Sequence, residues 1–317
     1  MRAIAPVLPG ETLAGKYRVE RIIGEGGMGI VVAARHLALD ERIAIKFLIG
    51  EPTASAVERF LREARAAAKI KGEHVCRVFD FGRLETGEPY IVMEHLEGID
   101  LARKLATEGP QAPVLVVGWI IEACAALAEA HALGIVHRDL KPANLFLAKR
   151  PDGSTCTKVL DFGISKLPSQ GQMTRTTATI GSPAYMSPEQ LESSRDVDAR
   201  SDVWSLGVVL HELLSGAPPF KAESMIELAL TIRGKAPPPI DGISPELRRV
   251  VSRCLAKDRA ERYANALELA TELAPFAPPD VAGLVARLER RRAAAPPEPA
   301  SAEKSAAAER AADDGGS

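Results

Sequence analysis

The sequence predicts an α+β fold with two unequal lobes, a small strand-rich N-terminal lobe and a larger helical C-terminal lobe. Residues 17–94 contain short runs rich in β-branched residues, separated by glycine turns, with one amphipathic helix among them. After about residue 97, apolar residues recur at helical spacing instead. A chain of 317 residues is long enough to build both lobes. A cleft between two lobes is a common place for a ligand.

The N-terminal lobe is expected to hold several strands and one main helix. Strands are predicted within residues 17–49, interrupted by a glycine cluster. Residues 55–70 repeat apolar side chains at helical spacing, and Thr53 or Ser55 can cap that helix. Residues 74–96 then predict two strands around a Thr-Gly turn.

The C-terminal lobe is expected to be built from helices. A long, mostly apolar helix is predicted over residues 113–133 and is expected to be buried on most sides. Residues 196–216 form another, ended by Gly216 and two prolines. Residues 244–258 and 265–274 are predicted to be helices on the same grounds.

The ends of the chain differ from the rest in composition. We expect a leader at residues 1–16, one large domain over 17–275 (lobes at about 17–94 and 97–275) and an Ala/Pro-rich tail at 276–317. Within the tail, residues 280–295 predict one amphipathic helix. The remainder has almost no large apolar residue and is expected to be disordered.

Composition excludes several classes of protein. A net charge of -2 and a pI near 6.4 lack the basic excess of a general nucleic-acid binder. The start of the chain has no signal-peptide core, and the apolar run 113–121 is too short to cross a bilayer. The cysteines are scattered, without a CxxC pair, which predicts reduced thiols in a cytoplasmic protein rather than a zinc site. They are Cys76, Cys124, Cys156 and Cys254.

Residues 24–31, "GEGGMGIV", place glycines in a GxGxxGxV pattern. A plain hairpin that needs positive φ explains such a cluster equally well. A dinucleotide-binding fold would require a helix after the glycines, whereas residues 30–36 predict a strand. A glycine-rich hairpin can lie close over a nucleotide, because backbone N–H groups can then approach phosphate oxygens.

Lys46 lies inside the apolar run "IAIK". One interpretation is an edge strand with a solvated lysine. The other is a clamp on anionic phosphates, since burying a lysine without a partner is costly. The clamp would itself need a carboxylate, with Glu63 as the leading candidate and Glu58 as a second.

Residues 137–146, "HRDLKPANLF", bring three functional side chains within six positions. If they serve one site, Asp139, Lys141 and Asn144 could abstract a proton, hold a phosphate and bind a metal. The alternative is an ordinary polar loop. "DFG" follows at 161–163, directly after the strand-like "TKVL".

These motifs together resemble protein kinases. "GEGGMGIV", "IAIK", Glu63 in "REARAAA", "HRDLKPAN", "DFG" and "SPE" occur in the order and approximate spacing of that family, over roughly residues 17–275. "HRDLKP" resembles the serine/threonine branch, because tyrosine kinases usually carry Ala or Arg at the position of Lys141. "GEGGMG" and "YMSPEQ" resemble its bacterial members. The resemblance implies a bilobal protein kinase fold and transfer of the ATP γ-phosphate to Ser/Thr hydroxyls of protein substrates in bacterial signalling.

The resemblance also implies roles for residues. Asp139 would accept the proton of the substrate hydroxyl, Lys141 would hold the γ-phosphate, and Lys46 would pair with Glu63. Asn144 and Asp161 would hold Mg²⁺, with Mn²⁺ as the alternative ion. The nucleotide would contact Ile23, Gly24, Gly26, Gly29, Val31, Ala44, Lys46, Met93 as gatekeeper, the backbone of Glu94 and Leu96, Asp100 at the ribose, and Phe146.

Further residues would act by supporting this site. Phe162 would pack under the helix that carries Glu63. The resemblance gives Asp202 the task of bracing the backbone of "HRD", and it pairs Glu189 with a buried Arg262.

The loop "QGQMTRTTATIGS" offers sites for a switch. We expect autophosphorylation at Thr174 or Thr176, with Thr177 and Thr179 as further candidates. In the family, an arginine such as Arg138 grips the phosphothreonine. A homodimer would allow one copy to modify another.

Two alternatives to an active protein kinase stay open. A pseudokinase acting as a scaffold would be favoured by loss of Lys46, Asp139, Asn144 or Asp161, and none is lost. A small-molecule phosphotransferase would not need "GSPAYMSPEQ", which resembles a platform for a peptide.

Overall fold

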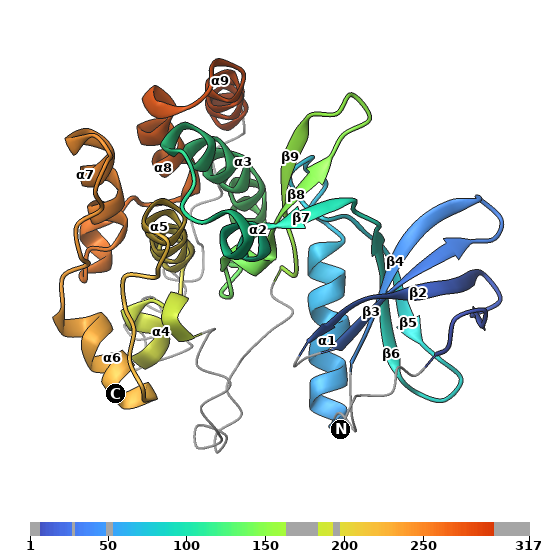
Figure 1. Cartoon of the computed structure of the whole chain (residues 1–317). Coiled ribbons are helices and arrows are strands. Elements are labelled where there is room, and N and C mark those ends of the chain that lie inside the picture. Colours follow the sequence, from blue (N-terminus) through green and yellow to red (C-terminus); the bar gives the residue numbers. More distant parts are fainter. Residues whose placement is uncertain (1–6, 27–28, 49–52, 163–182, 193–196, 295–317) are drawn as a thin grey trace, which may run out of the picture.

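The structure is a computed structural model that describes residues 7–26, 29–48, 53–162, 183–192 and 197–294, without the side chains of Ser55, Arg59 and Glu63. Figure 1 shows a twisted sheet with one helix against it, and a larger body of helices beside them. The predicted α+β arrangement of two lobes is confirmed.

The N-terminal lobe is one antiparallel sheet of order β1-β2-β3-β4-β6-β5. Alternating side chains of its central strands point into a small apolar core that includes Ile30, Val32, Ile45 and Phe47. The predicted strands on both sides of the glycine cluster and of the Thr-Gly turn are confirmed. The strands are β1 (Thr12–Leu13), β2 (Tyr17–Gly26), β3 (Gly29–His36), β4 (Glu41–Leu48), β5 (Val78–Arg83) and β6 (Pro89–Glu94).

The single long helix of this lobe is α1 (Ala54–Ala67). Its N-cap is Thr53, whose Oγ1 accepts the Ala56 N–H at 3.3 Å. Phe60 and Ala64 form its buried stripe against Ile91 of the sheet. The helix predicted over 55–70 is therefore confirmed, with Thr53 as its cap and an end at Ala67.

The helical lobe packs around α3, which is buried along most of its length, as predicted. Gly118 lets the segment before α9 approach α3, because a Cβ there would lie 3.3 Å from Pro278 Cδ. Gly216 ends α5 in the left-handed conformation with φ 85°. The helices are α2 (Leu101–Glu108), α3 (Pro113–Ala132), α4 (Pro188–Glu192), α5 (Ala199–Ser215), α6 (Met225–Gly234), α7 (Pro245–Cys254), α8 (Ala266–Leu273) and α9 (Pro279–Ala294).

The helical pattern expected after about residue 97 is incomplete, because the only strand predicted there is the strand-like "TKVL" before "DFG", which is confirmed as part of β9. A second antiparallel sheet, of order β7-β8-β9, lies in this lobe next to the first (Figure 1). Its strands are β7 (Gly98–Asp100), β8 (Leu145–Lys149) and β9 (Thr155–Val159). They are three to five residues long, too short for a hydrophobic period to show clearly in the sequence.

α3 has the length and composition of a membrane-spanning helix among the described residues, and 72% of its most apolar window is buried inside the protein. The run 113–121 was predicted to be too short to cross a bilayer, but the helix that contains it extends to Ala132. Burial of this kind is what the core helix of a folded domain shows.

The amphipathic helix predicted over 280–295 is confirmed as α9, which buries Val285 against the main core. Of the predicted leader, only residues 1–6 lie outside the described residues. Thr12–Leu13 form β1, and Val7 and Leu13 are buried in the apolar core of the first lobe, so residues 7–16 pack with that lobe. The disordered part of the predicted tail lies entirely outside the described residues. The four cysteines are free and buried, as predicted.

Candidate active site

The glycine cluster is a hairpin between β2 and β3. Gly24 pairs with Val31 and Gly26 with Gly29. A Cβ on Gly29 would lie 2.1 Å from the Phe47 carbonyl oxygen, so only glycine lets β3 approach β4 here. A strand follows the glycines, which rules out the dinucleotide-binding arrangement. Gly27 and Met28 lie outside the described residues.

Lys46 lies in the middle of β4, between Val31 of β3 and Ile91 of β6. It is 7% exposed, so the edge-strand interpretation with a solvated lysine is wrong. Its Nζ lies 2.7 Å from Asp161 Oδ1.

The carboxylate expected to hold Lys46 was Glu63 or Glu58. Among the described side chains its partner is Asp161 instead, and Glu58 is exposed near the start of α1. The side chain of Glu63 lies outside the described residues, so its pairing with Lys46 stays a prediction.

Asp161 adopts a left-handed backbone conformation with φ 56°, which is uncommon for a non-glycine residue and is seen at functional sites. Burial alone would raise its pKa. The charge of Lys46 and its hydrogen bond, with a smaller contribution from the charge of Lys141, outweigh burial and hold the pKa of Asp161 below its ordinary value. The carboxylate is therefore ionised at neutral pH and faces cations from both lobes.

The "HRDLKPAN" segment brings its three functional side chains together. Lys141 Nζ lies 2.8 Å from Asp139 Oδ2, and Asn144 Nδ2 donates to the Asp139 carbonyl at 2.7 Å. Residues Pro142–Asn144 form a single 3₁₀ turn that bends the chain so that this contact closes. The ordinary-loop interpretation is thereby disfavoured, because Asp139 and Asn144 are both buried.

Asp202 of α5 braces the backbone of this segment. Its Oδ2 accepts the His137 N–H and its Oδ1 accepts the Arg138 N–H, each at 2.9 Å. Arg138 has φ 67°, a strained conformation for arginine that these hydrogen bonds hold in place. His131 adds a contact of 2.8 Å to Asp202 Oδ2. The predicted role of Asp202 is confirmed.

His137 is fully buried and has a structural role. Its Nδ1 accepts the Asp139 N–H, so the proton of a neutral ring lies on Nε2, which donates to the Leu160 carbonyl at 2.8 Å. Phe162 packs edge-on against this ring at 5.0 Å and is buried in the core of the helical lobe. The histidine thus links the catalytic segment to the start of "DFG".

Glu189 and Arg262 form the predicted buried pair, at 2.7 and 3.0 Å through two parallel hydrogen bonds. Ser201 Oγ also donates to Glu189 at 2.6 Å. Burial would raise the pKa of Glu189, but Arg262 and Ser201 outweigh it and lower the pKa. Together with Ser201, this pair connects the "SPE" segment to α5 and to the segment between α7 and α8.

Replacing Arg262 by methionine is expected to destabilise the fold by about 3–5 kcal/mol, because Glu189 would stay buried without its partner. Chemical denaturation measures this. Arg233→Met is the control, since Arg233 and Glu192 form an exposed pair worth under about 1 kcal/mol. The Glu189 contribution is complete above the ordinary pKa of glutamate and is lost as pH falls through the lowered pKa. Equal stability of Arg262→Met and wild type would contradict the prediction.

The predicted adenine-pocket residues come from neighbouring strands of the two sheets and from the segment between them. Ala44 of β4 pairs with Met93 of β6, and Phe146 of β8 pairs with Asp100. Asp100 also caps α2, since its Oδ1 accepts the Arg103 N–H at 2.9 Å. Ile23 is 37% exposed beside the glycine hairpin. Leu96 lies between β6 and β7.

Two residues whose contacts support the site were not predicted from the sequence. Lys158 of β9 contacts Glu94 Oε2 at 3.0 Å and donates to the Glu73 carbonyl at 2.8 Å, which connects the strand before Asp161 to the segment between the lobes. Gln190 donates to the Arg138 carbonyl at 2.9 Å. Lys158 lies in "TKVL" and Gln190 ends "YMSPEQ", but their partners are far away in the sequence, so neither segment by itself indicates these contacts.

A cavity of about 730 Å³ lies elsewhere, between the end of α5 and the region of α6. None of the predicted site residues lines it, so it is not the site described above. The threonines predicted as phosphorylation sites, Thr174, Thr176, Thr177 and Thr179, lie outside the described residues.

Comparison with known proteins agrees with this geometry. Residues 17–273 match the model of the protein kinase domain. The chain is 40% identical over 276 residues to serine/threonine-protein kinase pkn3 of Myxococcus xanthus, covering 83% of this chain and 50% of that protein. It is 39% identical over 292 residues to PknB of Mycobacterium tuberculosis, covering 88% and 46%. The chain thus spans about half the length of the curated relatives it matches.

The solved structures agree as well. The crystal structure of the PknI kinase domain of Mycobacterium tuberculosis superimposes with a TM-score of 0.66 at 31% identity, over 85% of this chain and 99% of that one. With a family model that matches most of its length and a fold that matches too, the chain belongs to the protein kinase family.

Proposed function

We propose that this chain is an active serine/threonine protein kinase that transfers the γ-phosphate of ATP to Ser/Thr hydroxyls of proteins. The observation that carries the proposal is the convergence of two groups of residues. Asp139, Lys141 and Asn144 lie together on one loop, and Asp161, which pairs with Lys46, directly follows Leu160, whose N–H donates to the Asn144 carbonyl at 2.9 Å. The names of the matched relatives support the serine/threonine class.

The reaction needs positioning and neutralisation of charge more than covalent help. The substrate hydroxyl oxygen forms a bond to the γ-phosphorus while the bond from that phosphorus to the bridging oxygen of ADP breaks. Asp139 is placed to orient the hydroxyl and accept its proton. Lys141, already 2.8 Å from Asp139, would hold the γ-phosphate as charge builds on it.

The residues at this site fit a divalent cation with oxygen ligands. Asp161 is ionised, and Asn144 uses its Nδ2 to bind the Asp139 carbonyl, which turns its Oδ1 the other way. We propose that these two residues hold Mg²⁺, with Mn²⁺ as the alternative ion. The ion neutralises charge on the phosphates.

The nucleotide would lie between the two sheets. Lys46 would bind its phosphates and Glu63 would orient Lys46, while the glycines of the hairpin let the backbone approach. Adenine and ribose would contact the residues assigned above from the resemblance, with Met93 as gatekeeper. Asp100 can meet the ribose through the carboxylate oxygen that does not cap α2.

Labelled ATP with Mg²⁺ and a peptide library is the direct test. Phosphate is expected on serine or threonine and not on tyrosine, and Asp139→Asn is expected to remove the activity. Binding of ATP without transfer by the folded wild-type chain would instead identify a scaffold. Transfer only to small molecules would identify a phosphotransferase of another class.

We further propose a cytoplasmic location, where ATP and reduced cysteines occur together. Protein substrates are the expected partners, and a homodimer would allow modification of one copy by another. The free, buried state of all four cysteines supports this location.

Autophosphorylation is expected at Thr174 or Thr176, and it is expected to raise the activity. A phosphate there adds a charge of about -1.5 to -2 that Arg138 can bind. Mass spectrometry after incubation with ATP checks this, with Asp139→Asn as the inactive control. Full activity of a Thr174→Ala/Thr176→Ala variant, or no phosphate within residues 170–180 of active enzyme, would refute it.

A further inference from the structure

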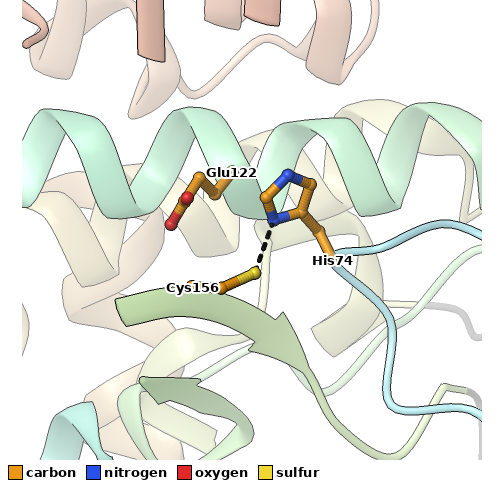
Figure 2. A group of neighbouring side chains, drawn as sticks. All are labelled: His74, Glu122 and Cys156. Atoms are coloured by element: carbon orange, nitrogen blue, oxygen red, sulfur yellow. Dashed lines mark hydrogen bonds between the residues drawn. The ribbon is translucent and has the colours of Figure 1, made fainter. Parts of the chain in front are cut away.

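Three buried side chains that play no part in phosphoryl transfer converge behind the active site. His74 comes from the loop between α1 and β5, Glu122 from α3 and Cys156 from β9, and Figure 2 shows them facing one another. Their candidate ligand atoms all lie within 4.8 Å of one another. All three residues are less than 9% exposed.

The separations of these atoms suit a single small ion. Cys156 Sγ lies 3.4 Å from His74 Nδ1, the contact drawn in Figure 2. The Thr157 carbonyl oxygen lies 3.0 Å from that nitrogen and 3.7 Å from the sulfur. Bonds of about 2.0–2.3 Å to a tetrahedral zinc ion place neighbouring ligand atoms roughly 3.3–3.6 Å apart.

Hydrogen bonding explains this cluster only in part. A carbonyl oxygen can only accept, so the contact with Thr157 requires a proton on His74 Nδ1. That proton occupies the lone pair which the Cys156 thiol would need as its acceptor. The thiol is then left with a weak contact of 3.7 Å to the Thr157 carbonyl.

Charge in the cluster favours a cation. The Glu122 carboxylate is 8% exposed, and burying a charge without an opposite charge is costly. Arg150 lies close enough to interact with Glu122, but it is ion-paired with Glu73 at 2.6 Å. Glu122 Oε2 accepts the Thr157 N–H at 2.8 Å, which orients the carboxylate and leaves its second oxygen as the one that can ligate.

We propose that His74 Nδ1, Cys156 Sγ and a carboxylate oxygen of Glu122 bind one zinc-class divalent cation, with water as the fourth ligand. Binding requires the Cys156 thiol to release its proton and the His74 ring proton to move from Nδ1 to Nε2, so the ion replaces the hydrogen bond from Nδ1 to the Thr157 carbonyl. Nitrogen, thiolate and carboxylate form a donor set that zinc accepts in proteins. The bound ion would join the loop that leads out of α1, the central helix α3 and the strand that leads to Asp161. It would stabilise the fold by cross-linking these three elements and would take no part in catalysis.

Cobalt is the probe, because a cysteine thiolate bound to Co²⁺ produces a charge-transfer absorption in the near ultraviolet. The full chain, treated with a chelator and dialysed, is titrated with CoCl₂. One equivalent is expected to produce the band in wild type. Cys156→Ser and Cys156→Ala should abolish it, whereas Cys76→Ser should keep it, since Cys76 is another buried thiol and stands outside the cluster.

The remaining ligands are tested by affinity. His74→Gln and Glu122→Gln should keep a thiolate but weaken cobalt binding by more than about tenfold. Zinc should raise the melting temperature of wild type and not that of Cys156→Ser, with circular dichroism as the check that each variant is folded. The proposal is overturned if wild type shows no band, if Cys156→Ser keeps it, or if elemental analysis after dialysis against zinc finds well under one equivalent per chain.

Discussion

Replacing Asp161 by asparagine is expected to reduce the rate of phosphoryl transfer by on the order of a hundredfold or more, equivalent to about 2.7 kcal/mol of transition-state stabilisation. A neutral amide cannot replace a carboxylate on a divalent cation. It also loses the charge attraction to Lys46, now 2.7 Å away. Steady-state kinetics with a peptide substrate at saturating Mg²⁺ measures the loss.

The fold should survive this change. The Asp161 side chain is 30% exposed, but Lys46 is buried and would lose its charged partner, so the free energy of unfolding should fall by about 1–3 kcal/mol, which leaves the chain folded. Asp152→Asn is the matched control, because Asp152 is an exposed residue of the turn between β8 and β9. Unaltered turnover in Asp161→Asn, or full activity of wild type with the metal chelated, would rule out the assigned role.

The second large effect is expected for Lys46→Met, which should abolish measurable transfer while the chain stays folded. Methionine keeps much of the lysine volume in the middle of β4 but removes the ammonium that would bind the phosphates. Nucleotide binding by calorimetry and transfer by kinetics are both measured. Lys149→Met, at an exposed position of β8, is the control and should behave like wild type.

Combining the two substitutions tests whether Lys46 and Asp161 act as one unit. Transfer by Lys46→Met is expected to be too slow to measure, so the comparison uses the affinity for the nucleotide with Mg²⁺, measured by calorimetry. Because the two residues contact each other directly, the double variant should lose little more affinity than the worse single variant. Losses that simply multiply would show that the two residues act independently. Near-normal turnover in Lys46→Met would refute the mechanism proposed here.

Much of the fold and part of the site could be predicted from the sequence because they depend on neighbouring residues. Strand and helix periods identified the sheet of the first lobe and the long helices α1, α3 and α5. Thr53 and Gly216 marked helix ends through local hydrogen bonding and a left-handed backbone. Asp139, Lys141 and Asn144 lie within six positions, so one tight turn is enough to bring them together.

The rest was decided by tertiary packing. Lys46 sits in a strand of one lobe and Asp161 follows a strand of the other, and no pattern in the sequence announces that their side chains meet. The short strands β7–β9 are stable only because they pair with one another, so their own residues carry little signal.

The cluster of His74, Glu122 and Cys156 is the clearest example of side chains that only tertiary packing brings together. Cysteine spacing predicts no metal site, because it considers only ligands that are close in sequence. The structure draws these three residues from a loop, a helix and a strand into one buried space. The sequence by itself determined the local elements and the family motifs, since these depend on residues that are near in the chain. Only the tertiary structure decided which distant side chains share a site, because packing of the whole core sets those distances.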